Sequence, residues 1–181
     1  MIFRNYSLIA IVYVSTLLQL SCGSNQDKPV QKTNIESKEF KEKLIDANKM
    51  SVKRESDEID QYVKRKGWDM IITGSGLRYM ITQKGAGELA KTEQRVKLNF
   101  NVKLLDGTIC YSSDSTGVYE FFIDKSSVET GLHEGVKYMH VGDKATMILP
   151  SHLAYGLIGD EKRIPPRASV LYELELLSVR Q

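Results

Sequence analysis

The stretch from residue 95 to residue 112 constrains the fold more than any other part of the sequence. Across Arg95–Leu105 apolar side chains alternate with polar ones, and Asp106-Gly107 follows at once. Strict alternation predicts a strand with one buried face, and Asp-Gly is a typical two-residue hairpin turn. Thr108–Ser112 is therefore expected to pair with the first strand, and the fold is expected to centre on an antiparallel sheet.

Further strands and a single helix complete the expected domain. Gly131–Val141 has helical spacing of its apolar residues, and runs of strands around one helix favour an α+β fold, an antiparallel sheet covering one short helix. The remaining segments of strand-like composition are Leu77–Gln83, Glu120–Asp124, Lys144–Leu149 and Ser169–Val179.

Composition fits one globular domain with an appendage. The chain has 181 residues, of which 41% are hydrophobic and 27% are charged. A formal charge of +2 provides no basic excess, so nucleic acid is not an expected partner. Two cysteines cannot form a disulfide framework.

The first residues have the features of a signal peptide. Arg4 precedes an apolar run, Leu8–Leu18, which is shorter than the roughly 20 residues that a bilayer span requires. Residues 19–24, QLSCGS, resemble a bacterial lipobox, which implies removal of residues 1–21 and lipidation of Cys22. Ordinary signal cleavage near Ser24 is the alternative, and it would leave a soluble protein. Residues 22–33 are polar and aperiodic, which predicts a flexible tether.

Residues 34–67 are expected to form a helical arm made of two helices. Thr33 and Glu36 have capping-box spacing ahead of the first helix, Ser56 is a suitable N-cap for the second, and Gly67 is a suitable stop. The narrow apolar stripe of the second helix favours a packing face on the surface. Contact with a partner or with a second copy of the chain is the alternative.

Motifs for metal, nucleotide or covalent chemistry are absent or mismatched in the sequence. His133 and His140 have the spacing H-E-x5-H instead of H-E-x-x-H, which favours two surface histidines. Gly74-Ser75-Gly76 lacks the third glycine of a dinucleotide fingerprint, and no nucleophile elbow or C-x-x-C occurs. No metal and no cofactor are therefore expected.

Several ordered motifs resemble the FKBP family of peptidyl-prolyl cis-trans isomerases. They are GLHEGVKYMHVGDKATMILPSHLAYG at 131–156, IPPRASVLYELELL at 164–177 and the turn LLDGTICYSS. The resemblance implies an FKBP-type isomerase domain over residues 75–181, with a sheet wrapped on one short helix. Together with the lipobox and the charged arm, GWDMIITGSGLRYMI at 67–81 resembles the gliding-motility-associated FKBP-type lipoproteins.

The resemblance also implies a pocket for a prolyl peptide. Tyr155, in LAYG, matches the tyrosine whose hydroxyl bonds the substrate carbonyl, and Phe100 and Tyr172 join it as the expected catalytic residues. Residues 156–163 match the flap over the pocket. The other expected pocket residues are Tyr119, Val128, Glu129, Leu132, Ile164, Cys110 and Tyr111.

Three positions depart from the usual family pattern. Cys110-Tyr111 stands in place of Phe-Asp, where the Asp supports the polar side of the pocket, so catalytic efficiency is open. Leu132 replaces a Trp at the pocket floor, and Glu129 replaces an Ile that contributes mainly a backbone N–H. The alternative for several pocket residues is ordinary core packing, which applies to Phe100, Val128, Leu132 and, as an inert buried thiol, Cys110.

These observations predict an isomerase of the cell envelope that acts on X-Pro segments of exported proteins and assists their folding. A lipid anchor would hold it to a membrane facing the periplasm, with inner and outer membrane both open. The alternative is a non-enzymatic FKBP-like binding module or chaperone in an envelope or motility assembly, which the Cys110-Tyr111 departure motivates. A homodimer or an envelope complex through the helical arm is a further hypothesis.

Overall fold

A computed structural model describes residues 38–181 of the chain. The predicted signal peptide 1–21, the lipidation site Cys22, the tether 22–33 and the cap at Thr33 lie outside the described residues. Among the helices of the described part, none is both long and apolar enough to cross a bilayer.

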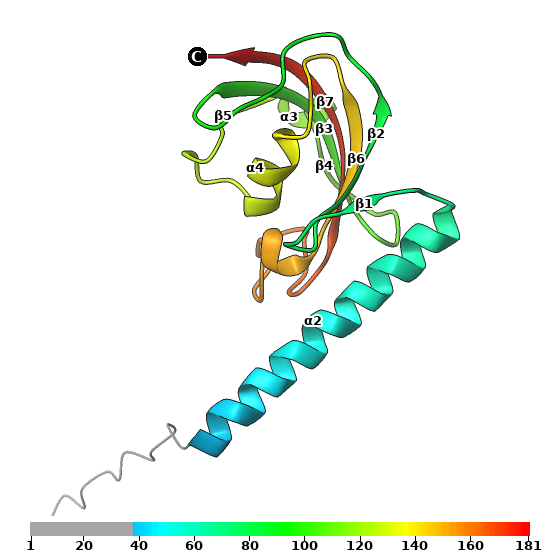
Figure 1. Cartoon of the computed structure of the whole chain (residues 1–181), viewed down its shortest axis with the longest axis vertical. Helices are drawn as coiled ribbons and strands as arrows, with labels where there is room; N and C mark the ends of the chain where they lie inside the picture. The colour runs from blue at the N-terminus through cyan, green and yellow to red at the C-terminus, as the bar shows by residue number, and fades with distance from the viewer. Residues whose placement is uncertain (1–37) are drawn as a thin grey trace, which may run out of the picture. The chain divides into compact units, whose positions relative to one another are not determined.

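The centre of the fold is a seven-stranded antiparallel sheet, which confirms the predicted α+β class (Figure 1). The strand order is β1-β2-β6-β7-β3-β4, and β5 also pairs with β3, beyond the end of β4. The strands are β1 Ile71–Ile72, β2 Arg78–Gln83, β3 Arg95–Leu104, β4 Ile109–Ser112, β5 Tyr119–Phe122, β6 Lys144–Leu149 and β7 Val170–Arg180. The short helices are α3 Ser113–Thr116, α4 Thr130–Val136 and the 3-10 turn η1 Ser151–Leu153.

The predicted pairing of the hairpin strands is confirmed. The turn, however, is centred on Leu105 and Asp106, and the second strand begins at Ile109, not Thr108. β3 and β4 pair antiparallel with Val102 opposite Tyr111, and the N–H of Gly107 donates to the carbonyl of Leu104 at 3.0 Å. Gly107 has φ 95°, a left-handed conformation that glycine adopts without steric strain. The turn therefore supplies the backbone geometry that fixes the register of the two strands.

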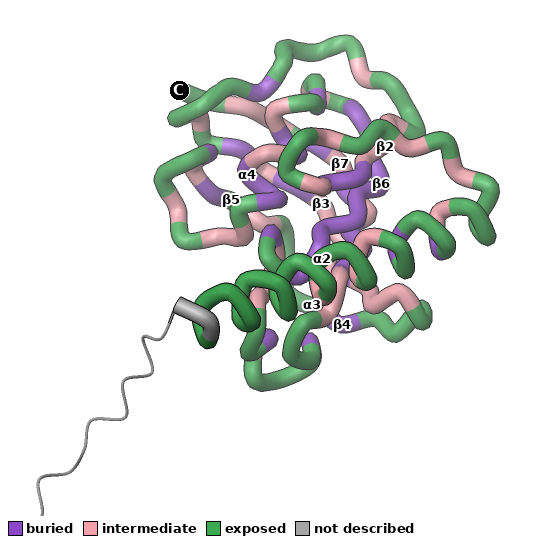
Figure 2. Tube along the Cα trace, turned by 60° about the horizontal axis from the view of Figure 1, so that its bottom comes forward, coloured by how far each residue is buried: buried purple, intermediate pink, exposed green. Residues whose placement is uncertain are grey.

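Helix α4 packs into the concave side of the curved sheet, and the main core lies between them (Figures 1 and 2). Two glycines allow the close approach to β6. A Cβ on Gly135 would lie 2.3 Å from the sulfur of Met147, and one on Gly131 would lie 2.6 Å from Cγ of Leu149. The helix can therefore bury Leu132 and Val136 completely against the sheet.

Two predicted boundaries in this region are wrong. Helix α4 ends at Val136 and not at Val141, because the chain beyond it pairs through a bridge between Leu89 and His140. Strand β5 is Tyr119–Phe122, not Glu120–Asp124, because Asp124 adopts a left-handed turn at φ 61°. The first correction comes from a contact with a distant segment and the second from a local turn, and the spacing of apolar residues reveals neither.

The N-terminal arm is one helix, α2, Lys38–Lys66, and the predicted break at Ser56 is wrong. No glycine or proline interrupts the helix, and most of its residues are favourable helix formers. The Ser56 hydroxyl does not cap a second helix. It accepts a hydrogen bond of 2.6 Å from Nη2 of Arg78, so a tertiary partner satisfies it inside the helix.

The C-terminal half of α2 packs on the outer face of β6 and β7. Ile59 is fully buried there with Ile148 and Leu171, which face each other across the two strands and point away from the main core. Asp60 pairs with the buried Arg78 at 2.8 Å, and Glu55 accepts hydrogen bonds from Ser151 and Ser169. The apolar stripe is thus a packing face, as the sequence favoured, whereas residues 44–50 of the same helix are exposed (Figure 2).

Candidate functional site

One cavity of about 310 Å³ stands out because its lining is mostly aromatic and aliphatic. Strands β3, β4, β5 and β7 contribute to it, together with the end of α3, its connection to β5, the residue before α4 and the loop after η1. Three other hollows are larger. Two of them, about 500 and 510 Å³, are lined mostly by polar and charged residues, and the third, about 340 Å³, has glycines and charged residues in its lining and only one aromatic side chain apart from His140. Ligand sites are typically clefts of roughly 300–1,000 Å³ with apolar walls and few polar groups, so the aromatic cavity is the candidate site.

Six of the ten residues predicted from the sequence line this cavity. The Phe100 and Tyr119 rings form one wall, with centroids 5.7 Å apart and planes inclined by 54°. They come from the paired strands β3 and β5, whose register places Tyr119 opposite Leu98, two residues from Phe100. The six are Phe100, Tyr111, Tyr119, Glu129, Tyr155 and Tyr172.

The other four predicted residues belong to the core and do not line the cavity. Leu132 is fully buried on α4, Ile164 is 2% exposed and Cys110 is 1% exposed, and Val128 packs against the same cluster. For Val128 and Leu132, the alternative of core packing therefore describes the structure better. Burial raises the pKa of the Cys110 thiol, in keeping with an inert, protonated cysteine.

Four lining residues were missed by sequence reasoning. Val102 lies two residues after Phe100 on β3 and shares its face, so strand periodicity could have found it. Thr116 is the last residue of α3, and Gly117 and Val118 form the connection from α3 to β5. No sequence signal indicates that this segment reaches the cavity.

Two tyrosine hydroxyls supply hydrogen-bond donors in the cavity. The hydroxyls of Tyr155 and Tyr172 lie 3.5 Å apart, and Tyr172 is 3% exposed. Burial, with the negative charge of Glu129 as the next cause, raises the pKa of both tyrosines well above the usual value. Both hydroxyls therefore stay protonated near neutral pH and can donate to a carbonyl oxygen.

Glu129 occupies the N-cap position of α4, but its side chain does not cap the helix. Its backbone carbonyl accepts hydrogen bonds from the N–H groups of Leu132 and His133 at 2.9 and 3.2 Å. Its own N–H makes no hydrogen bond within residues 38–181, so this donor is available to a ligand. Oxygen Oε2 of the side chain is buried and has no hydrogen-bond partner in the same part of the chain.

Cys110 and Tyr111, which stand in place of the usual Phe-Asp, connect strand β4 to the flap at residues 156–163. The Tyr111 hydroxyl donates to Oδ2 of Asp160, and Nη1 of Arg163 donates to the Cys110 carbonyl at 2.6 Å. Partial desolvation opposes ionisation of Asp160, but the hydrogen bonds from Tyr111 and from the N–H groups of residues 162–164 outweigh it. They lower the pKa of Asp160 to about 2. Tyr111 therefore gives this side of the cavity a polar contact to the flap.

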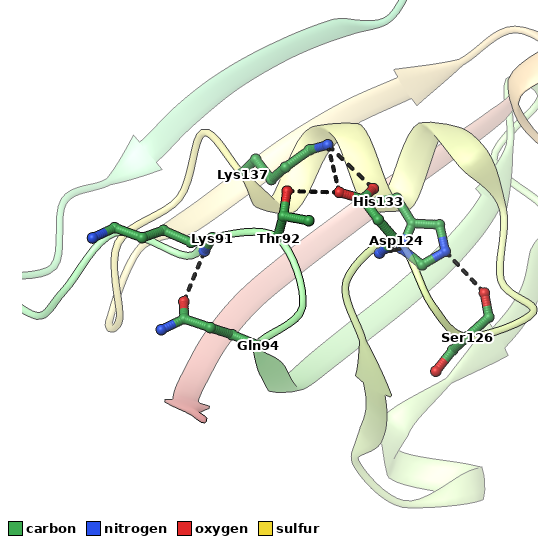
Figure 3. A network of polar contacts seen from close by, with 7 residues as sticks. All are labelled: Lys91, Thr92, Gln94, Asp124, Ser126, His133 and Lys137. Atoms are coloured by element: carbon green, nitrogen blue, oxygen red, sulfur yellow. Dashed lines mark hydrogen bonds and ion pairs between the residues drawn. The ribbon is translucent and has the colours of Figure 1, made fainter.

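A polar network holds the segment that leads into Glu129 (Figure 3). His133 accepts a hydrogen bond from the Asp124 N–H at its Nδ1 and therefore donates from Nε2 to the Ser126 carbonyl, at 2.9 and 3.0 Å. Lys137 contacts both carboxylate oxygens of Asp124. The predicted surface position of His133 is wrong, since it is 9% exposed and ties the loop to α4, whereas the His140 side chain is exposed as predicted.

Comparison with known proteins places these features in a family. The model of the family described as FKBP-type peptidyl-prolyl cis-trans isomerase matches residues 86–177, more than half of the chain. A Haemophilus influenzae protein, described as a probable FKBP-type peptidyl-prolyl cis-trans isomerase, is 33% identical over 161 residues, 85% of this chain and 65% of that protein. The FKBP-type 22 kDa isomerase of Escherichia coli is 32% identical over 121 residues, 67% of this chain and 57% of that protein.

Solved structures agree with the fold. The crystal structure of AtFKBP13 superposes with a TM-score of 0.59 at 28% identity, covering 61% of this chain and 98% of that one. A peptidyl-prolyl cis-trans isomerase from Pseudomonas syringae pv. tomato gives a TM-score of 0.61 at 25% identity, covering 74% and 96%. The chain thus spans nearly all of these solved chains but less than two thirds of the curated relatives it matches.

Proposed function

The chain belongs to the FKBP-type peptidyl-prolyl cis-trans isomerase family, and we propose that it isomerises X-Pro bonds in exported proteins and so assists their folding. The observation that carries this proposal is the cavity, which combines aromatic walls with the protonated hydroxyls of Tyr155 and Tyr172. Neither a nucleophile nor a metal is needed for this reaction.

The chemistry of amide rotation matches such a cavity. Twisting a peptide bond removes its resonance, and the barrier in water is about 18–20 kcal/mol. The planar amide is more polar than the twisted one, so an apolar site that excludes water favours the twisted state relative to the ground state. That difference in binding is sufficient for catalysis.

The proposed roles of the residues follow from their groups. Tyr155 donates its hydroxyl to the substrate carbonyl, and the unpaired N–H of Glu129 is a second donor. Phe100 and Tyr172 form the apolar surface on which the proline ring turns. Because these contacts hold one side of the bond while the other rotates, they can bind the twisted state more tightly than the planar one.

The experiment is cis–trans exchange of a short Ala-Pro peptide, followed by NMR in the presence of the full chain. Acceleration that decreases about tenfold or more in Phe100→Ala supports the proposal, because the variant removes an aromatic wall from the cavity. Absence of acceleration by micromolar folded protein would contradict it.

The cell envelope is the proposed location, with Cys22 as the lipidated residue. The lipobox-like residues 19–24 support the anchor, and the resemblance to gliding-motility lipoproteins supports a role in gliding. Mass spectrometry of the mature chain tests lipidation, since Cys22→Ser would leave an unmodified precursor. Loss of gliding on deletion of the gene, restored by the intact chain, tests the role in motility.

A non-enzymatic binding module is the second candidate. The replacement of the usual Phe-Asp by Cys110-Tyr111 and the contact of Tyr111 with the flap residue Asp160 favour it. In that case cavity variants would retain full function in cells, whereas loss of residues 38–66 would abolish it.

A homodimer or an envelope complex through α2 is compatible with either candidate. The exposed apolar residues of α2 support this proposal, and sedimentation of the full chain tests the dimer. A monomer would exclude the homodimer. The residues concerned are Leu44, Ile45, Met50 and Val52.

A further inference from the structure

A single charged side chain lines the aromatic cavity. Among the described residues of the lining, Glu129 is the only one with a carboxylate, an amine, a guanidinium or an imidazole. The remaining lining residues are neutral, and five of them are aromatic. The electrostatic character of the cavity therefore depends mainly on this one carboxylate.

The Glu129 carboxylate is turned toward the cavity and not toward the helix. It makes no cap hydrogen bond to α4, and its negative charge acts on Tyr119, Tyr155 and Tyr172, which come from three separate elements around the cavity. Its Oε2 atom is buried without a hydrogen-bond partner in the described part of the chain. A buried acceptor without a donor is unfavourable, so a ligand that brings a donor to this position is favoured.

No positive charge of the described chain neutralises Glu129. It takes part in no ion pair there. Arg163 in the flap is the basic residue beside the cavity wall, and it is already engaged. Its Nη1 donates to the Cys110 carbonyl, and its guanidinium lies 5.4 Å from the centre of the Tyr111 ring. The cavity therefore offers a negative charge that no cation of the described residues balances, next to the hydroxyls of Tyr155 and Tyr172. In this partly desolvated setting a charge-assisted hydrogen bond is stronger than in water.

We propose that Glu129 determines substrate specificity, favouring prolyl segments with a Lys or Arg directly beside the proline and disfavouring segments with an acidic residue there. This inference rests on the proposed isomerase function. The proline ring has no N–H and cannot satisfy Oε2 itself, so the donor comes from a neighbouring residue of the segment. A basic side chain supplies both the donor and the opposite charge.

The experiment compares capped tetrapeptides Ala-Xaa-Pro-Phe and Ala-Pro-Xaa-Phe in which Xaa is Lys, Ala or Glu. The full chain is expected to isomerise a Lys peptide about tenfold more efficiently than the matching Glu peptide, in at least one of the two series. The difference in efficiency between the Lys and Glu peptides becomes smaller in high salt, because the cavity is open to solvent and dissolved ions screen the charges. In Glu129→Gln the Lys-to-Glu ratio falls to within about twofold of one.

A matched control removes one negative charge elsewhere on the same helix. Glu134 lies on α4, outside the cavity lining, and accepts a hydrogen bond from Ser75 at 2.7 Å. Glu134→Gln is expected to keep the Lys-to-Glu ratio of the unaltered chain. If Glu134→Gln lowers the ratio as much as Glu129→Gln, the effect is one of overall charge and the proposal is overturned.

The outcomes separate this inference from the proposed function. Acceleration of the Ala peptides with equal rates for Lys and Glu peptides overturns the specificity and leaves the isomerase intact. If no peptide is accelerated, the isomerase proposal fails, and peptide affinities from NMR shift titrations then decide the inference. A preference for Lys peptides that Glu129→Gln abolishes supports it, and equal affinities overturn it. Glu129→Ile, the residue usual in the family, is a second variant in case Glu129→Gln does not fold.

Discussion

Substitution of Ile59 by alanine tests whether helix α2 is part of the folded domain. Ile59 is fully buried between α2 and the sheet, against Ile148 and Leu171. The change removes three carbons at about 0.8 kcal/mol each, and the cavity that remains adds to the loss. We expect a decrease of about 3 kcal/mol in the free energy of unfolding. At this chain length the melting temperature would fall by roughly 6–12 °C.

Urea unfolding followed by circular dichroism measures the effect, and Ile45→Ala is the matched control. Ile45 lies on the same helix but is 52% exposed, so its substitution should change stability by less than about 0.5 kcal/mol. Both variants replace isoleucine by alanine in a helix, so the change in helix propensity cancels in the comparison. A loss below about 1 kcal/mol in Ile59→Ala would refute the packing described for α2. So would melting of the helix in a separate transition before the sheet unfolds.

Three further predictions concern the cavity and the helix inside the sheet. Tyr155 and Tyr172 stay protonated through pH 10, because their pKa values are raised. Isomerase activity should therefore be constant from pH 7 to 10, and a decline centred on pH 10 would contradict this. Tyr111→Phe should lower stability at pH 7 by about 1–2 kcal/mol. The same variant should also unfold at a higher pH on acidification. The stability due to Asp160 is present above about pH 4 and is lost as the pH falls towards 2, and loss of the Tyr111 hydrogen bond weakens it. An unchanged acid unfolding curve would argue against the contact. Gly135→Ala should lower the free energy of unfolding by about 1–3 kcal/mol, measured by thermal melting, and a neutral effect would show that α4 can shift away from β6.

Local sequence patterns predicted the elements whose structure depends on short-range geometry. The alternation at residues 95–105 and the Asp106-Gly107 turn led directly to the β3–β4 hairpin. Local patterns gave wrong predictions where contacts between distant residues decide the structure. Ser56 has the chemistry of an N-cap, but Arg78 satisfies its hydroxyl inside a continuous helix. His133 is polar, but its ring is buried because the backbone of two other residues bonds both nitrogens.

The site was predicted in part for the same reason. Tyr155 and Phe100 were found from motif order and do line the cavity. Whether a residue faces the cavity or the core depends on how α4 sits against β6, and this arrangement places Leu132 in the core. The contact between Tyr111 and Asp160 joins residues 49 positions apart, and no local pattern indicates it.

The most direct test of the isomerase account compares Tyr155→Phe with the full chain in NMR exchange of an Ala-Pro peptide. Tyr138→Phe is the control, because it removes the same hydroxyl from a tyrosine outside the cavity that stacks on Tyr79. The account predicts acceleration by the unaltered chain and by Tyr138→Phe, and a decrease of about tenfold in Tyr155→Phe. Equal acceleration by all three proteins would contradict the role of Tyr155, and no acceleration by any folded form would contradict the isomerase itself.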